Sequence, residues 1–175
     1  GLLVDHQANI TEAAQFNDAS TGLFFMRVRF EASAAAALLR DAFAALAARY
    51  VMRWDLHNAN ARMPTVIMVS KLGHCLNDLL FRYRSQLLPL DIRAIVSNHR
   101  DFYQLAASYD IPFHHIPVTA ATKERAEDRL REVLAQENVE LVVLARYMQV
   151  LSERLCSDLS GRAINIHHSF LPSFK

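Results

Sequence analysis

Four short, continuously apolar runs constrain the fold of this chain more than any other feature. They occupy residues 66–69, 92–96, 141–144 and 163–166. A strand that is apolar on both of its alternating faces needs cover on both sides, which parallel sheets receive from flanking helices. Helical patterns lie between the runs, as in residues 122–136. The alternation predicts an α/β fold with a doubly wound, mostly parallel, Rossmann-like sheet.

The segment 122–136 shows the helical spacing clearly. Its apolar stripe consists of Ala126, Leu130, Val133 and Leu134. On the opposite side Lys123, Glu127 and Arg131 follow one another at intervals of four residues, so they are expected to form ion pairs along the helix.

A polar segment, residues 55–64, ends in Pro64 and predicts a domain boundary. The predicted domains are residues 1–60 and 64–175. In the first, residues 24–30 alternate as a half-buried antiparallel strand does, and residues 8–14 form a weaker strand. Residues 18–22 are typical of the turn that joins them. A helix through the alanines at 34–37, with Ser33 as its cap, completes a small α+β domain.

Composition excludes several classes of protein. The four glycines lie more than twenty residues apart in every case, so neither G-x-G-x-x-G nor a Walker A loop can be drawn. The formal net charge of +1 arises from 19 basic and 18 acidic residues that are interspersed, which gives no footprint for nucleic acid.

The chain also lacks the marks of membrane and secreted proteins. Its most apolar stretch, residues 32–50, carries Arg40, Asp41 and Arg49, and no charged segment followed by an apolar one opens the chain. Two cysteines, Cys75 and Cys156, cannot make a disulfide framework. We therefore expect a cytoplasmic protein.

Polar side chains gather where the predicted strands end, which is the edge that binds ligands in such sheets. These residues are Ser70, Lys71, His74, Ser97, Asn98, His99, Arg146, Tyr147, Met148, Asn165, His167 and His168. Asn165 and His167 are two residues apart on a strand and so share a face. An amide that holds an oxyanion beside an imidazole that moves a proton suits acyl chemistry. A purely structural, hydrogen-bonded role for the pair is an equally good interpretation at this point, and nothing marks Ser169 as an activated nucleophile.

No metal site is expected. His114 and His115 are adjacent, as are His167 and His168, so each pair points to opposite faces of a strand, and no metal-binding motif accompanies them. Cys75 follows His74, but neighbours on a helix do not face each other, which favours a structural cysteine.

Two segments together resemble the formyltetrahydrofolate-dependent formyltransferase superfamily: residues 143–151 and residues 165–172. Within it, residues 68–80, 96–99 and 111–118 are similar to the formyltetrahydrofolate deformylases. In the first domain, residues 9–13 and 24–28 resemble the regulatory ACT-type domain that precedes the catalytic domain of those enzymes.

The resemblance implies hydrolysis of 10-formyltetrahydrofolate to formate and tetrahydrofolate, which supplies formate for purine biosynthesis and balances one-carbon pools. Asn165 and His167 would be the catalytic residues, with water as the nucleophile. The folate would bind along the segment that contains Leu144, Met148, Gln149, Val150 and Leu151. No cofactor beyond the folate substrate is implied.

The resemblance further implies a third catalytic group, an Asp downstream of His167 and outside this chain. The chain starts within one pattern and stops within another, so we expect it to be truncated at both ends. An ACT-type domain implies an amino-acid effector as a candidate ligand, although Gln7 and Ala8 stand where such domains often carry glycines. Edge-to-edge pairing of such domains implies a homo-oligomer.

Two alternatives stay open. The first is an amine formyltransferase of the glycinamide ribonucleotide transformylase type, which carries a small-residue phosphate loop after its first strand. Here residues 71–75 fill that place with bulkier side chains and one glycine. The second is a non-catalytic sensor that binds folate and an amino acid.

Overall fold

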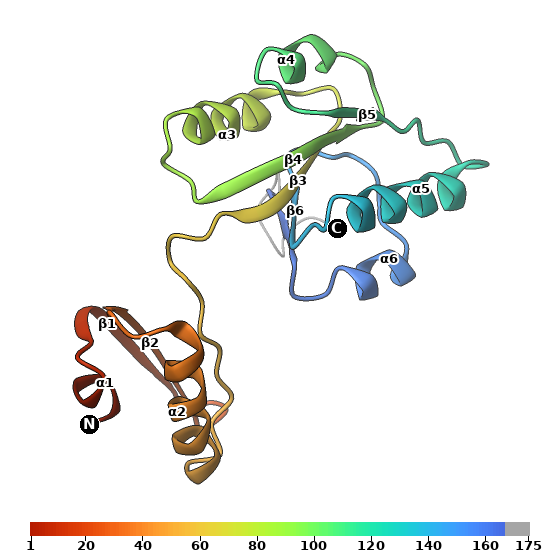
Figure 1. Ribbon diagram of the computed structural model, residues 1–175. Coiled ribbons are helices and arrows are strands. Elements are labelled where there is room, and N and C mark those ends of the chain that lie inside the picture. Colours follow the sequence, from red (N-terminus) through yellow and green to blue (C-terminus); the bar gives the residue numbers. More distant parts are fainter. Residues whose placement is uncertain (167–175) are drawn as a thin grey trace. The chain divides into compact units, whose positions relative to one another are not determined.

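The computed structural model describes residues 1–166 of the 175-residue chain. It divides into two compact units, Gly1–Ala61 and Arg62–Lys175 (Figure 1). Within residues 1–166, no helix combines the length and the apolar character that crossing a membrane requires.

The first unit is a hairpin flanked by helices. Its elements are α1 (Leu2–Asp5), β1 (Asn9–Asp18), β2 (Leu23–Glu31) and α2 (Ala36–Arg49). β1 and β2 pair antiparallel from Asn9 with Glu31 to Asp18 with Leu23, and a bulge interrupts the register between Ile10 and Glu12. The predicted order of two antiparallel strands and a long helix is confirmed.

The predicted turn between the two strands owes its shape to one carboxylate. Asp18 accepts hydrogen bonds from the Ser20 backbone N–H at 2.9 Å, the Ser20 hydroxyl at 2.7 Å and the Thr21 hydroxyl at 2.6 Å. Gly22 follows with a φ of 67°, in the left-handed region that glycine enters without steric cost.

Two details of the first unit differ from the prediction. The cap of α2 is Ala35, with no side-chain hydrogen bond, rather than Ser33. Because a serine caps only from the position directly before the first helical residue, the later helix start leaves Ser33 outside. The strand expected to be half-buried is mostly exposed: Phe24 is 60% exposed and Phe25 52%, and only Val28 and Phe30 are partly covered.

The second unit is built on a five-stranded sheet. Its strands are β3 (Met63–Val69), β4 (Leu90–Ser97), β5 (Phe113–His115), β6 (Leu141–Leu144) and β7 (Ala163–Asn165). They lie in the order β5-β4-β3-β6-β7, and every neighbouring pair is parallel. The four apolar runs are all strands. β5 was not predicted, because a three-residue strand with two histidines offers no apolar run.

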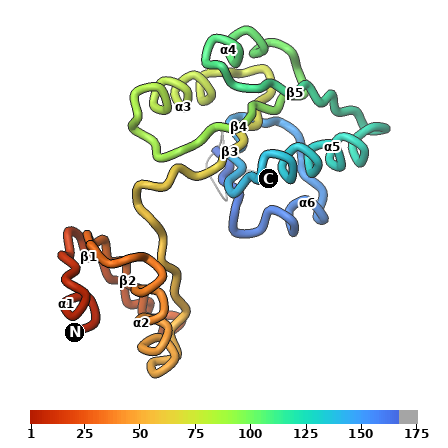
Figure 2. Tube along the Cα trace, in the orientation of Figure 1, coloured from red at the N-terminus to blue at the C-terminus, as the bar shows by residue number. Residues whose placement is uncertain are grey.

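Helices cover both faces of this sheet. α3 (His74–Arg84) and α4 (Tyr103–Ala107) lie on one side, and α5 (Lys123–Gln136) and α6 (Glu153–Asp158) on the other (Figures 1 and 2). Alternate residues of β3 divide between two cores: Val66 and Met68 pack toward α5 and α6, Ile67 and Val69 toward α3 and α4. The doubly wound parallel fold is thereby confirmed.

The chain order of the strands locates the ligand-binding edge. From the central strand β3 the chain moves outward through β4 and β5, then crosses to β6 and β7 on the other side. Ligands of such sheets bind beyond the carboxyl ends of the strands where this reversal occurs. The switch point here lies between β3 and β6.

Candidate active site

A buried hydrogen-bond network joins three strand ends at the switch point. The Ser70 hydroxyl, directly after β3, donates to Asn98 Oδ1 after β4 at 2.7 Å. The same oxygen accepts the backbone N–H of Met148, in the loop after β6, at 2.9 Å. Ser70 is 2% exposed and Asn98 8%. The sequence placed these residues at one edge, and the structure brings them into contact.

The loop that follows β6 makes a sharp turn against β3. Ala145 N–H donates to the Met68 carbonyl at 2.8 Å, and the Ser70 N–H donates to the Arg146 carbonyl at 3.3 Å. Between them Arg146 has a φ of 63°, in the left-handed region that is unfavourable for a residue with a Cβ atom. The turn brings the start of the loop back beside the central strand.

A second network holds the far end of this loop. Glu127 of α5 accepts hydrogen bonds from the Ser152 backbone N–H, at 2.8 Å, and from the Ser152 hydroxyl. Ser152 in turn caps α6 by accepting the Leu155 N–H at 3.2 Å. Burial, and then the negative charge of Glu127, raise the pKa of Tyr147 to about 12, so this phenol is neutral at physiological pH.

The ion pairs predicted along α5 are therefore wrong. Among residues 1–166, Glu127 pairs with neither Lys123 nor Arg131. The Glu127 carboxylate accepts its hydrogen bonds from Ser152. Arg131 instead forms ion pairs with Asp128 at 2.8 Å and Asp158 at 2.7 Å. Ser152 and Asp158, both distant in sequence, and Asp128, three residues before Arg131 on the same helix, take the place of the partners expected at intervals of four residues.

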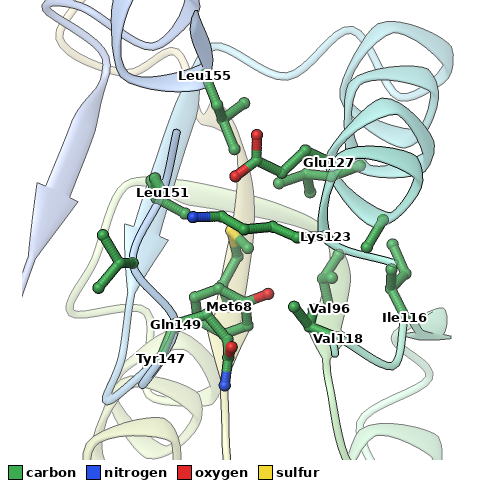
Figure 3. A pocket seen from close by; sticks show the side chains of 13 residues that line it. Met68, Val96, Ile116, Val118, Lys123, Glu127, Tyr147, Gln149, Leu151 and Leu155 are labelled. Carbon is green, nitrogen blue, oxygen red and sulfur yellow. The ribbon is translucent and has the colours of Figure 1, made fainter. Parts of the chain in front are cut away.

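Figure 3 shows the small pocket between this loop and α5. Lys123 and Glu127 reach into it from the helix, and Tyr147, Gln149 and Leu151 from the loop. The cavity measures about 10 Å³, room for about one water molecule. A folate ring does not fit inside it, so this space packs the loop against the helix, and the outer side of the loop faces solvent.

The residues predicted to bind folate fall into three groups. Met148 and Val150 are 51% and 83% exposed, whereas Gln149 and Leu151 are half-buried. Leu144 is buried in the core beneath α5, so its side chain is covered. The outward side chains of the loop are therefore those of Met148 and Val150.

Asn165, one of the two predicted catalytic residues, is the last residue of β7. It is in register with Leu144, and the next residue, Ile166, donates its N–H to the Leu144 carbonyl at 3.1 Å. Asn165 is exposed, at the same sheet edge as the loop after β6. His167, His168 and Ser169 lie outside the described residues.

The other sequence candidates occupy separate places. Cys75 is half-buried against the core under α3, and Cys156 is exposed. His115 accepts a hydrogen bond at Nδ1 from Arg100, at 3.3 Å, on the side of the sheet away from β7. In the described part of the chain, no three His, Cys, Asp or Glu side chains are grouped as a metal site would require.

The comparisons with known proteins agree with this architecture. The sequence profile described as formyl transferase matches residues 63–175. The chain belongs to the formyl transferase family. It is 51% identical to a formyltetrahydrofolate deformylase of Corynebacterium sp. strain P-1, over the whole of this chain and 62% of that protein.

Solved structures give the same family. A formyltetrahydrofolate deformylase from Burkholderia mallei matches all of this chain and 63% of its own, with a TM-score of 0.92 and 48% identity. A phosphoribosylglycinamide formyltransferase from Coxiella burnetii matches 65% of this chain and 55% of its own, with a TM-score of 0.57 and 34% identity. The chain spans about three fifths of the length of the deformylases that it matches.

Two features of the site could not be inferred from the sequence. The bond between Ser70 and Met148 joins residues 78 positions apart, and that between Glu127 and Ser152 joins residues 25 apart. The only sequence signal for the second was Ser152 directly before Glu153, a common start of a helix.

Proposed function

We propose that the product of the complete gene hydrolyses 10-formyltetrahydrofolate to formate and tetrahydrofolate. The observation that carries the proposal is the shape of the β6–β7 edge. There the exposed amide of Asn165 ends β7, beside the anchored loop that follows the neighbouring strand β6. The similarity to deformylases over the whole chain supports the same reaction.

In this proposal each residue at the edge has one task. The Asn165 amide donates to the formyl oxygen as the carbon becomes tetrahedral, which places a fixed donor where negative charge develops. His167 stabilises that oxygen or transfers the proton, water is the nucleophile, and an Asp further along the gene product sets the protonation of His167. The folate lies along residues 144–151, with Met148 and Val150 as its exposed apolar contacts.

The alternative acceptor, a phosphorylated amine, has less support. In the transferases the place after the first strand is a loop of small residues, whereas here Lys71 and Leu72 are exposed and occupy it. Its glycine, Gly73, is used for packing, because a Cβ there would collide with the Phe102 ring. The match to a deformylase covers all of this chain, whereas the match to a transferase covers 65% of it, which also favours the hydrolase.

The first unit suits a regulatory role, which is also part of the proposal. Its order of strands and helix fits an ACT-type domain that binds an amino-acid effector. β1 and β2 each have an unpaired edge within this unit, and Phe16, Phe24, Phe25 and Met26 are exposed on them. Such edges favour pairing between copies, and hence a homo-oligomer. We place the protein in the cytoplasm, where its formate would feed purine synthesis.

The decisive experiment supplies the product of the complete gene with 10-formyltetrahydrofolate and no amine, and measures formate. Catalytic release of formate that glycinamide ribonucleotide does not change supports the hydrolase. Release of the formyl group only when that amine is present would make the protein a transferase. Binding of folate without either reaction would make it a sensor.

A variant tests the residue on which the mechanism depends. Asn165→Ala is expected to lower turnover by about 10²-fold or more, as the loss of an oxyanion donor does. Asn60→Ala, an exposed asparagine near the end of the first unit, is the matched control and is expected to keep wild-type turnover. An Asn165→Ala protein with unchanged circular dichroism and near wild-type turnover would remove Asn165 from the mechanism.

A further inference from the structure

Ser70 makes three hydrogen bonds, and two of them go to the loop after β6. Its backbone N–H donates to the Arg146 carbonyl at 3.3 Å, and its hydroxyl oxygen accepts the Met148 N–H at 2.9 Å. The hydroxyl proton goes to Asn98 Oδ1 at 2.7 Å. One buried residue thus fixes both ends of a three-residue turn, and the orientation of its side chain is fixed by a second strand end.

The turn needs such support from outside. Arg146 has a φ of 63°, and there is no glycine between Leu141 and Ser160 that could adopt this conformation without strain. A strained backbone persists only where the surrounding structure holds it. The Ser70 N–H donates to the carbonyl of the strained residue itself, and the Ser70 hydroxyl oxygen accepts the amide two residues later.

The hydrogen bonds also limit what Ser70 can do. Its proton is donated to Asn98, its oxygen accepts Met148, and the residue is 2% exposed. A nucleophilic serine needs a base to take its proton and access to the substrate. Ser70 has neither, so its hydroxyl holds the backbone in place and takes no part in bond making.

We propose that Ser70, oriented by Asn98, is a positioning residue that holds residues 145–149 in the form that binds folate. The inference rests on the proposed function only for the identity of the ligand. Ser70 fixes the Met148 amide, while the Met148 side chain, 51% exposed, remains available outside. Loss of the hydroxyl frees the turn, and binding energy must then be used to restore it.

The first test needs no substrate. Ser70→Ala in the present chain is expected to raise the amide hydrogen-exchange rate of Met148 by about tenfold, the loss of one hydrogen bond expressed as a rate. Ser70→Thr keeps the hydroxyl and is expected to keep the slow rate. Thr65→Val is the matched control: it removes a buried hydroxyl from the same strand, at the other end, where Thr65 donates to the Met63 carbonyl at 2.8 Å.

The second test uses the product of the complete gene. Ser70→Ala is expected to raise the KM for 10-formyltetrahydrofolate by about tenfold with kcat changed less than about threefold, since the loop binds ground state and transition state alike. Ser70→Thr should restore the KM. If Ser70→Ala does not fold, Asn98→Ala, which retains the serine, should give the same changes at about a third of the size.

The outcomes separate the two proposals. A Met148 exchange rate that stays slow in Ser70→Ala, or a KM that Ser70→Ala and Thr65→Val change equally, would overturn the positioning role. A wild-type protein that releases no formate would overturn the proposed function, yet the exchange measurement would still decide whether Ser70 holds the turn.

Discussion

The two units of this chain use apolar residues in opposite ways. In the second unit the central strand is covered on both sides, and Val66, Ile67 and Val69 are completely buried. In the hairpin of the first unit Phe16, Phe24 and Met26 are each at least 60% exposed, and within residues 1–61 only Leu39 and Ala47 are buried apolar residues. A two-stranded sheet is marginal without a packed face. Apolar content therefore predicts stability only where the fold supplies layers to cover it.

The largest expected effect is the contrast between a buried and an exposed truncation. Ile67→Ala leaves a cavity in the sheet and should lower the free energy of unfolding of the second unit by about 2–5 kcal/mol. Phe25→Ala, 52% exposed, should cost the first unit less than about 1 kcal/mol.

Two probes follow the two units separately. The single tryptophan, Trp54, lies in the first unit with its ring 4.8 Å from that of Phe43, so its fluorescence during a urea titration follows that unit. Hydrogen exchange of the β3 amides at each urea concentration follows the second unit. Equal costs for the two truncations in an isolated chain would mean that Phe25 is covered, which contradicts the comparison.

Two glycines sharpen the contrast, because one is needed for space and the other for conformation. Gly73→Ala should cost the second unit about 1–3 kcal/mol, since its Cβ would collide with the Phe102 ring in the packed core. Gly22→Ala meets no neighbouring atom, but at a φ of 67° it should cost the first unit about 1 kcal/mol.

A double-variant cycle distinguishes these causes. Phe102→Leu should reduce the cost of Gly73→Ala, because a smaller side chain leaves room for the new methyl group. The same change should leave the cost of Gly22→Ala as it was. If Gly73→Ala costs as much in the Phe102→Leu background as in the wild type, the collision is not the cause.

How far the sequence predicts this structure follows the same division. Short runs such as Leu141–Leu144 favour a buried strand because they contain β-branched valines and are too short for a helix, whereas the longer, alanine-rich apolar run 42–48 lies in α2. Alternation in residues 24–30 specifies a strand but not what covers it, so the burial of Phe24 was predicted wrongly. At the site, strand ends were predictable from local pattern, whereas the bond from Ser70 to Met148 depends on which strands are neighbours, a property of the whole sheet.

The smallest effect concerns pH and the turn of the first unit. Hydrogen bonds from Thr21, and then from Ser20, lower the pKa of Asp18 from 3.8 to about 2. A carboxylate whose pKa is depressed by folding stabilises the fold above its unfolded pKa and loses that contribution as pH falls through the folded value. The first unit should thus lose stability between about pH 4 and pH 2.

Asp18→Asn isolates this contribution from those of the other carboxylates. The variant cannot titrate, and its one side-chain oxygen can still accept the two hydrogen bonds from Ser20, although not also the Thr21 bond to the second carboxylate oxygen. Its urea midpoint, followed by Trp54 fluorescence, should therefore fall less than that of the wild type between about pH 4 and pH 2. Asp5→Asn, on the exposed helix before β1, is the matched control and should behave as the wild type. Parallel loss of stability in the wild type and Asp18→Asn would show that the turn does not depend on the charge of Asp18, and the hairpin would then owe its acid sensitivity to other groups of the first unit.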